Sequence, residues 1–349
     1  MTEFSFELGA IDAPNPSDDA ALMRIAMSVA ETARTRTSPN PWVGAVVVSA
    51  SGNIVGAGAT APVGGPHAEV SALQQAGEQA RGGTLVVTLE PCCHVGRTPP
   101  CTDAIIEAGI SRIVVAIIDP DVHVAGNGVT TLREAGITVE TGVCGSEVLQ
   151  QLLPYAHHRR TGRPFVLAKI AATLDGHTAA ADGSSQWITG EAARRDAHRL
   201  RAESDAIIVG AGTVRMDDPS LTVRHVEGRD PIRVVLGTAP DGAKVHPCLQ
   251  WSSSLEDLLD ELGSQGCLQV LVEGGATTLA SFYSAGLIDR WAVYLAPGFM
   301  GGAPSYPLIN TASRKTIGDF TRGTIIDTRV LDGDVLLLVD PPTKERAEH

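Results

Sequence analysis

The sequence predicts two α/β domains in series, and three observations support this fold class. With 349 residues, the chain is longer than one hydrophobic core of ordinary size requires. Short runs rich in β-branched residues alternate with helical patterns in both halves, as in sheets that contain parallel strand pairs. A polar stretch at 155–164 interrupts this alternation. We therefore expect domains at 1–150 and 164–349, joined by a linker at 151–163.

In the first half, proline opens one predicted helix at Pro66, and Gly109 follows the end of another. Runs of Val and Ile indicate the buried strands between them. In chain order the sequence predicts strand 43–48, helix 66–76, strand 84–89, helix 100–107, strand 112–118, helix 129–135, strand 137–141 and helix 146–153.

The second half repeats this alternation without detectable sequence similarity to the first. It is expected to close with a hairpin at 322–339 that turns at Asp332 and Gly333. Before the hairpin we predict strand 165–172, helix 191–202, strands 206–209 and 232–236, helix 255–262, strand 268–272, helix 276–285 and strand 291–295.

Composition argues against several classes of protein. The net charge is −13, and residues 1–150 carry 7 Arg and no Lys against 16 Asp or Glu, which gives −9. A surface this acidic should repel phosphate backbones, so no nucleic-acid partner is expected. No apolar run is long enough to cross a membrane, and the first seven residues lack a basic region. We expect a cytoplasmic protein without a membrane partner.

One stretch carries a metal-binding pattern. His67 and two of the six cysteines, Cys92 and Cys101, can give zinc three ligands and leave a fourth position for water. Glu69 follows the histidine by two residues, which matches the H-x-E and P-C signature of zinc deaminases, where glutamate is the catalytic acid and base. Without a signal peptide, metal binding is favoured over disulfides.

Other interpretations of this stretch stay open. A structural zinc site would need a fourth protein ligand, which Cys93 or His94 could supply. Glu69 could be a solvated carboxylate favoured by the first turn of a helix. A non-catalytic zinc scaffold would make this glutamate dispensable. A deaminase acting on tRNA or single-stranded bases would share the motif but should carry a basic or aromatic face.

Longer motifs resemble one family. The cysteine loop reads Glu-Pro-Cys-Cys-His-Val-Gly-Arg-Thr-Pro-Pro-Cys at 90–101. Further matches are Lys-Ile-Ala-Ala-Thr-Leu-Asp-Gly at 169–176, Gly-Ser-Ser-Gln-Trp-Ile-Thr at 183–189, Val-Gly-Ala-Gly-Thr-Val at 209–214, Asp-Asp-Pro-Ser-Leu-Thr-Val-Arg at 217–224 and Val-Glu-Gly-Gly at 272–275. Together they resemble the bifunctional deaminase-reductases of riboflavin biosynthesis over roughly residues 20 to 340.

The resemblance implies a cytidine-deaminase-like three-layer α/β/α domain followed by a dihydrofolate-reductase-like α/β domain. It implies a Zn²⁺-dependent deamination of 2,5-diamino-6-ribosylamino-4(3H)-pyrimidinone 5′-phosphate. The ribosyl group of the product would then be reduced to ribityl with NADPH. The expected partner is therefore a phosphorylated pyrimidine, and we expect a homo-oligomer of undefined size.

The resemblance also implies roles for individual residues. Glu69 would be catalytic, with zinc on His67, Cys92 and Cys101. Substrate would contact Asn40, Arg97, Thr98, Ser185, Arg201, Leu221, Arg224 and Glu273. NADPH would contact Ala171, Trp187, Thr213, Asp217, Gly275, Ala276, Thr277, Thr278, Leu279, Ala280 and Ser281.

Some of these positions have simpler alternatives. Asn40 lies between prolines and is also typical of a turn, and Arg97 could be a solvated loop arginine. Asp121 stands where the family usually has asparagine, which puts a substrate hydrogen bond there in doubt. Lys169 and Asp175 lie near the expected reductase site, but the sequence assigns them no role.

Overall fold

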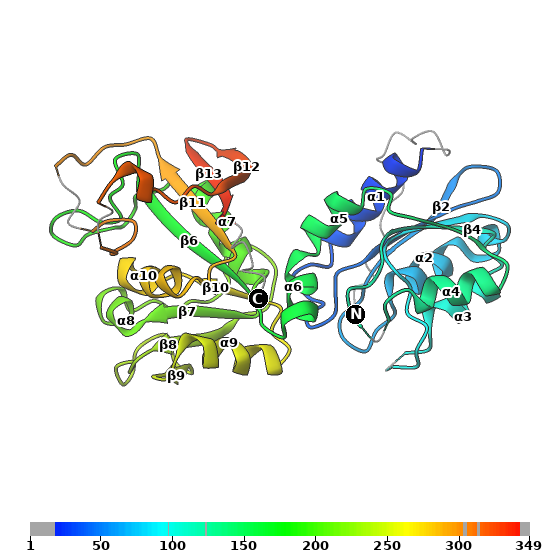
Figure 1. Ribbon diagram of the computed structural model, residues 1–349, viewed down its shortest axis with the longest axis horizontal. Coiled ribbons are helices and arrows are strands. Elements are labelled where there is room, and N and C mark those ends of the chain that lie inside the picture. The colour runs from blue at the N-terminus through cyan, green and yellow to red at the C-terminus, as the bar shows by residue number, and fades with distance from the viewer. Residues whose placement is uncertain (1–17, 97, 123, 303–305, 313–314, 343–349) are drawn as a thin grey trace. The chain divides into compact units, whose positions relative to one another are not determined.

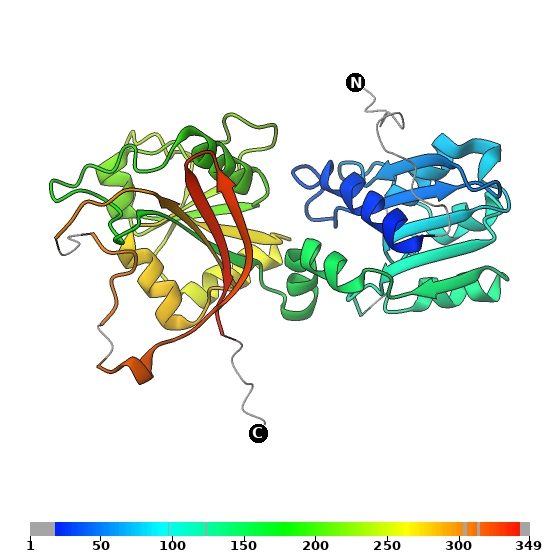
Figure 2. The same ribbon diagram turned by 90° about the horizontal axis from the view of Figure 1, so that it is seen from above.

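The computed structural model describes residues 18–96, 98–122, 124–302, 306–312 and 315–342. The chain divides into two compact units between Gly162 and Arg163 (Figures 1 and 2). Among the described residues, no helix is long and apolar enough to cross a membrane.

The first unit contains a five-stranded sheet with the order β2-β1-β3-β4-β5. The strands are β1 (Gly44–Val48), β2 (Ile54–Ala59), β3 (Thr84–Leu89), β4 (Arg112–Ile117) and β5 (Thr138–Thr141). β1 runs antiparallel to β2 and β3, whereas β3, β4 and β5 are parallel. The carboxyl ends of β3 and β4 therefore meet at the same edge of the sheet.

Helices cover both faces of this sheet, which confirms three layers (Figure 1). α1 (Asp19–Glu31) and α5 (Gly145–Gln151) lie on one face, and α2 (Ala68–Ala76), α3 (Cys101–Glu107) and α4 (Asn127–Glu134) on the other. Glycine allows the close approach: a Cβ on Gly44 would collide with the Ala26 carbonyl of α1. A Cβ on Gly58 would lie 2.5 Å from the Ala68 carbonyl oxygen of α2.

Several elements of the first unit differ from the sequence prediction. α1 was not predicted, although Asp18 caps it by accepting a hydrogen bond from the Ala21 amide at 3.0 Å. β2 was also missed, because its two glycines weaken the pattern of a strand. A 3₁₀ turn (Gly77–Ala80) follows α2.

Residues 151–163 were predicted as a linker, but the structure places helix α6 (Leu153–Thr161) there. The helix is polar overall, so its sequence resembles a loop. Nevertheless, Tyr155 and Ala156 are 4% and 0% exposed, because they pack against the first unit. The Tyr155 hydroxyl donates to Asp119 Oδ1 at 3.0 Å, which ties the helix to the segment after β4.

The second unit is built on an eight-stranded sheet with the order β12-β13-β11-β6-β10-β7-β8-β9. Its central strands are parallel, and β13 is antiparallel both to β11 and to its hairpin partner β12. The strands are β6 (Phe165–Thr173), β7 (Ala206–Gly210), β8 (Ile232–Leu236), β9 (Leu249–Trp251), β10 (Gln269–Val272), β11 (Arg290–Ala296), β12 (Thr324–Leu331) and β13 (Asp334–Asp340). The helices are α7 (Glu191–Ala202), α8 (Ala211–Asp217), α9 (Leu255–Ser264) and α10 (Ala276–Ala285), with a 3₁₀ turn at Ile317–Asp319.

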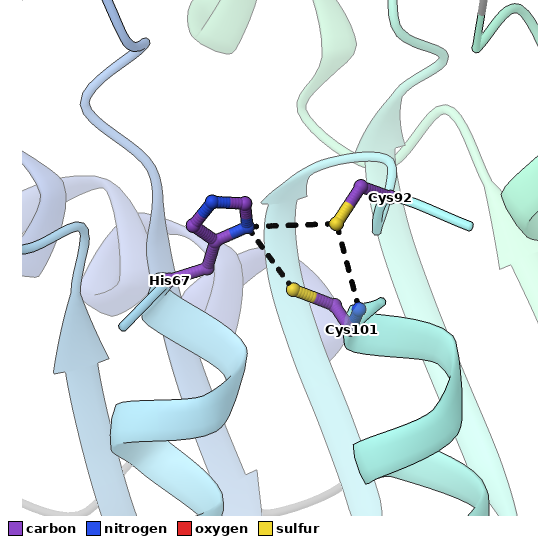
Figure 3. A group of neighbouring side chains, drawn as sticks. All are labelled: His67, Cys92 and Cys101. Carbon is purple, nitrogen blue, oxygen red and sulfur yellow. Dashed lines mark hydrogen bonds between the residues drawn. The ribbon is translucent and has the colours of Figure 1, made fainter. Parts of the chain in front are cut away.

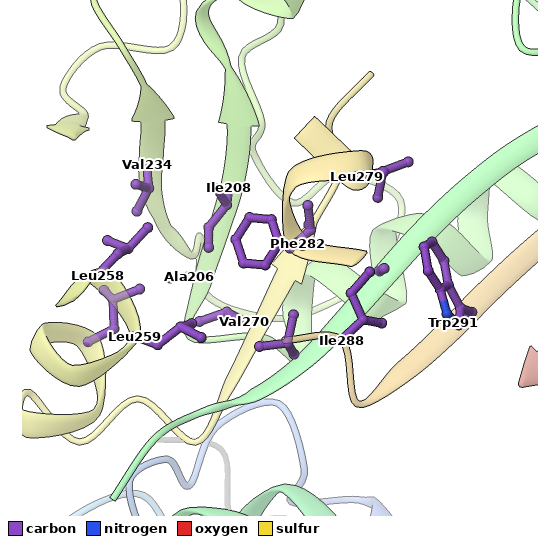
Figure 4. Packing of buried hydrophobic residues seen from close by; sticks show 14 of the residues in the cluster. Ala206, Ile208, Val234, Leu258, Leu259, Val270, Leu279, Phe282, Ile288 and Trp291 are labelled. Atoms are coloured by element: carbon purple, nitrogen blue, oxygen red, sulfur yellow. The ribbon is translucent and has the colours of Figure 1, made fainter. Parts of the chain in front are cut away.

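Successive side chains of the central strands enter two different hydrophobic cores. In β7, Ile208 packs with Leu258 of α9 and Phe282 of α10, as Figure 4 shows. Its neighbour Ile207 packs on the opposite face with Leu200 of α7. A strand buried on both faces reads as a continuous apolar run, which is why the sequence predicted the central strands well. The shorter α8 and β9 were missed.

Candidate active sites

Three chain segments bring the predicted metal ligands together at one edge of the first sheet (Figure 3). His67 is the N-cap of α2, and Cys101 is the first residue of α3. Cys92 follows the carboxyl end of β3. Since α2 and α3 begin at the same edge of the sheet, His67 and Cys101 lie next to each other there.

The geometry of this group suits a zinc ion. The His67 Nδ1 atom lies 3.2 Å from Cys101 Sγ and 3.5 Å from Cys92 Sγ, and all three ligand atoms lie within 4.8 Å of one another. Nitrogen and sulfur ligands of tetrahedral zinc are about 3.6 Å apart, given the usual bond lengths. The Cys101 amide also donates to Cys92 Sγ at 3.4 Å, which favours a thiolate there.

The pKa values of the two thiols also favour metal binding. Hydrogen bonding to the Cys101 thiol, together with contacts to His67, lowers the pKa of Cys92 to about 4 despite its burial. The pKa of Cys101 is raised, because that thiol donates to Cys92 and is buried. Without a cation, the pair therefore holds one negative charge. A divalent cation can compensate two negative charges and so allows both thiols to ionise. The donor set therefore fits zinc.

Glu69 lies beside the metal-binding group without belonging to it. Its side chain is 4% exposed and lies beside the Cys101 side chain. Burial raises the pKa of Glu69 to about 7, and the neighbouring His67 opposes this rise. A carboxyl group with this pKa can both accept and release a proton near neutral pH.

The possible fourth protein ligands are not part of the group. Among the described residues, the metal-ligating cluster that forms contains His67, Cys92 and Cys101, but neither Cys93 nor His94. His94 is exposed on the cysteine loop. The described geometry thus corresponds to three protein ligands, the number that an open catalytic site uses.

Glu90 is a buried residue of this region that the sequence analysis did not single out. Its carboxylate accepts hydrogen bonds from the amides of Asp119, Gly126 and Val129 at 3.1, 2.9 and 3.1 Å. It thereby holds the segment after β4 against the turn that carries Cys92. Its position next to Pro91 and Cys92 was a signal that could have identified it.

The other described residues singled out in the first unit do not belong to the metal-binding group. Asn40 is half-buried in a turn, where its amide donates to the Thr37 carbonyl at 2.9 Å. Thr98 is half-buried, and Arg97 lies outside the described residues. Asp121 faces Arg159 of α6, with 3.6 Å between its Oδ2 and the guanidinium Nε. This cation compensates the charge that aspartate adds at that position.

In the second unit, the carboxyl ends of parallel strands again gather predicted site residues. Glu273 follows β10, and its carboxylate forms two hydrogen bonds of 2.8 Å with the Arg201 guanidinium. Both side chains are largely buried. Burial would raise the pKa of Glu273, but the cations of Arg201 and Lys169 lower it to about 2. Lys169 thus belongs to this charged cluster.

Next to Glu273, the start of α10 lies close to the end of β7. The Gly275 amide donates to Thr213 Oγ1 at 3.3 Å. A Cβ on Gly274 would collide with the Thr278 side chain, and one on Gly210 would lie 2.5 Å from Thr278 Oγ1. The glycines therefore let the start of α10 pack closely against the end of β7. A helix N-terminus at the end of a strand is an arrangement that suits the phosphates of a dinucleotide.

The other residues expected at the reductase site come from several separate segments. Trp187 is 69% exposed, and the Arg194 guanidinium lies 4.7 Å from its ring centre. Ala171 is near the end of β6, and Asp217 ends α8, where burial raises the pKa of its carboxyl. Ser185 is half-buried in the segment before α7.

Asp175, whose role the sequence left open, organises a loop. Its carboxylate accepts hydrogen bonds from Thr173 Oγ1 at 2.6 Å, the Met300 amide at 3.0 Å and the Gly301 amide at 2.7 Å. These bonds, that with Thr173 above all, lower the pKa of Asp175 to about 2. The residue therefore connects the end of β6 to the segment after β11.

The fold and the metal site define a zinc-binding deaminase domain followed by a reductase-type α/β domain. Residues 16–117 match the family model "Cytidine and deoxycytidylate deaminase zinc-binding region", and residues 164–336 match "RibD C-terminal domain". The chain belongs to the riboflavin biosynthesis protein RibD family of bifunctional enzymes. The two domains have the cytidine-deaminase-like and dihydrofolate-reductase-like folds expected from the sequence.

Curated relatives match most of the chain. The riboflavin biosynthesis protein RibD of Corynebacterium ammoniagenes is 47% identical, covering 87% of this chain and 94% of that protein. The Escherichia coli protein of the same name is 40% identical and covers 81% of this chain and 89% of its own length.

Solved structures of the same family have a similar fold over most of the chain. Acinetobacter baumannii RibD has a TM-score of 0.86 at 39% identity, covering 93% of this chain and 98% of its own. A Thermotoga maritima diaminohydroxyphosphoribosylaminopyrimidine deaminase/5-amino-6-(5-phosphoribosylamino)uracil reductase has a TM-score of 0.83 at 35% identity, with the same coverage.

Proposed function

We propose that the first domain, which includes α5 and α6, deaminates 2,5-diamino-6-ribosylamino-4(3H)-pyrimidinone 5′-phosphate. The second, residues 164–349, then reduces the ribosyl group of 5-amino-6-(5-phosphoribosylamino)uracil to ribityl with NADPH. The similarity to the Thermotoga maritima enzyme named for these two activities supports this choice of substrates. The observation that carries the proposal is the His67, Cys92 and Cys101 group with Glu69 buried beside it.

In the deaminase, each residue of the site has a separate task. Zinc, when bound to His67, Cys92 and Cys101, supplies a water acidified enough to act as a nucleophile near neutral pH. Glu69 accepts the proton of the attacking water at its carboxylate and delivers it to the ring nitrogen. It then takes a second proton, from the hydroxyl added to the ring carbon, and delivers it to the amine, which leaves as ammonia. Its buried position excludes bulk water, and its pKa of about 7 suits both directions of transfer.

In the reductase, the chain binds two phosphorylated molecules side by side. NADPH supplies a hydride for the ribosyl carbon. The amides at the start of α10 would hold its phosphates, and Ala171, Trp187, Thr213, Asp217 and residues 275–281 would line its binding site. Ser185, Arg201, Leu221, Arg224 and Glu273 would hold the substrate, and Asn40, Arg97 and Thr98 would do so in the deaminase.

Two further expectations are kept as proposals. We place the enzyme in the cytoplasm, because two zinc-binding thiols must stay reduced. We also propose a homo-oligomer that uses β12, since this edge strand exposes Ile325, Ile326 and Val330. Light scattering of the wild type and of Val330→Lys would test this: a wild-type monomer contradicts it.

Ammonia release from the diaminopyrimidine phosphate, measured with and without NADPH, tests the whole proposal. We expect ammonia in both cases and NADPH oxidation only after deamination. A zinc-loaded protein that releases no ammonia from this substrate contradicts the proposed deaminase. An acidic domain is also expected to leave bases in single-stranded nucleic acid unchanged.

A further inference from the structure

The segment 218–225 of the second domain has an unusual backbone. Asp218, Leu221 and His225 adopt positive φ angles of 40°, 53° and 69°, which residues other than glycine rarely do. This segment also carries Arg224, a residue of the proposed substrate site. Such a conformation persists only where contacts with the surrounding structure hold it in place.

Helix α7 supplies two of these contacts. Arg201 Nη1 donates to the Thr222 carbonyl at 3.2 Å, while its other nitrogens bind Glu273. One turn earlier on the same face of the helix, His198 Nδ1 accepts a hydrogen bond of 3.0 Å from the Arg224 amide. A third contact comes from outside the helix, where Asp230 Oδ1 accepts from the Val223 amide at 2.7 Å.

The chemistry of His198 allows only a passive role. The residue is 6% exposed, and its Nδ1 must be unprotonated to accept a bond from a backbone amide. Burial, together with the nearby cations of Arg201 and Arg224 and the His225 ring, lowers the pKa of His198 to about 4. At neutral pH the imidazole is therefore uncharged. It can orient a neighbour, but it cannot bind an anion by charge.

Hydrogen bonds within the same segment hold the Arg224 side chain. Its Nη1 donates to Ser220 Oγ at 2.6 Å and to Thr222 Oγ1 at 3.2 Å, so the guanidinium is held along the segment and stays partly exposed. If the backbone at Arg224 shifts, the guanidinium shifts with it. Paired hydrogen bonds from a guanidinium to a phosphate require a fixed orientation.

We propose that His198 is a positioning residue of the reductase site, which fixes the Arg224 backbone so that its guanidinium meets the substrate phosphate. The inference rests on the proposed function, in which Arg224 binds the substrate. It adds a residue that touches neither substrate nor cofactor but determines how well Arg224 binds.

Two amide variants form a matched test in the full-length, zinc-loaded enzyme. In His198→Asn the side-chain oxygen can occupy the place of Nδ1, whereas in His198→Gln it lies one bond further out. With 5-amino-6-(5-phosphoribosylamino)uracil as the probe, we expect His198→Gln to raise the reductase KM about 10-fold, as expected for losing one buried hydrogen bond. His198→Asn should stay within about threefold of wild type, and kcat and the KM for NADPH should change little in both variants.

Combining each change with Arg224→Ala identifies the route of the effect. We expect Arg224→Ala alone to raise the substrate KM, and His198→Gln to add less than twofold on that background, since the two act as one unit. If Arg224→Ala leaves the substrate KM unchanged, the proposed role of Arg224 fails. If it raises KM but His198→Gln does not, or if the effect of His198→Gln persists without Arg224, the positioning role is wrong.

Discussion

Replacing Glu69 by glutamine should separate proton transfer from metal binding. The two side chains have nearly the same shape, but glutamine carries no ionisable proton. Because Glu69 lies outside the ligand group, Glu69→Gln should retain zinc. Ammonia release should fall by about 10²-fold to 10⁴-fold, the usual contribution of general acid and base catalysis. Reduction of an already deaminated substrate should continue.

The same substitution should stabilise the metal-free protein at high pH. Burial raises the pKa of Glu69 from 4.5 to about 7, so between these values the folded protein binds more protons than the unfolded chain. Stability of the wild type therefore falls as the pH rises through this range, by about 3 kcal/mol in total. Glutamine does not titrate. The gain in unfolding free energy of Glu69→Gln over the wild type should therefore be complete above about pH 7 and absent below about pH 4.5.

Hydrogen exchange in urea, followed in peptides from β1 and β3, reports the stability of the first domain within the full chain. Metal should be removed with a chelator. The stabilities of the wild type and Glu69→Gln should then be compared at about pH 5 and about pH 8, on either side of most of the expected change. An equal difference at both pH values would refute the burial argument. Normal ammonia release by the variant would show that another group handles the protons.

Three further outcomes are expected. Cys93→Ser should keep about one zinc per chain and its deaminase activity, whereas Cys92→Ser should lose both; metal analysis that shows zinc loss from the first variant would indicate a closed structural site. A truncated chain of residues 1–162 should be soluble and release ammonia, whereas residues 1–145 should aggregate because they lack α5 and α6; equal solubility would contradict the packing of these helices. Glu273→Gln leaves its guanidinium partner without a buried counter-charge and should destabilise the protein by about 3 to 5 kcal/mol in urea unfolding. Since the pKa of Glu273 is lowered to about 2, this stabilisation is complete above pH 4.5 and lost as the pH falls toward 2; a cost independent of pH in that range would refute the ion-pair explanation.

The helices α5 and α6 show where a local sequence pattern is misleading. Residues 146–161 are polar enough to suggest a short helix and a linker. In the structure Val148, Leu152 and Ala156 are each 0% exposed, because few but well-placed apolar side chains suffice to pack a helix. Only the packed structure shows that these residues belong with the first domain's core.

Strand direction in the first sheet was only partly predictable from the sequence. The sequence predicted β1 and the parallel pairs, but not β2, which is antiparallel to β1. Gly56 and Gly58 make β2 look like a loop, yet these residues are what lets α2 approach the sheet. A residue type that weakens a local pattern can thus be required by a contact with a distant helix.

The sequence by itself predicted the group of His67, Cys92 and Cys101 with Glu69 beside it, the buried strands and the family. These follow from local spacing: a ligand at a helix start, a glutamate two residues later and cysteines after a strand form recognisable patterns. Tertiary structure alone decided that Glu90 holds the segment after β4, and that His198 accepts the Arg224 amide. Such contacts join residues far apart in the chain, so they depend on strand order and helix packing, which no local pattern records.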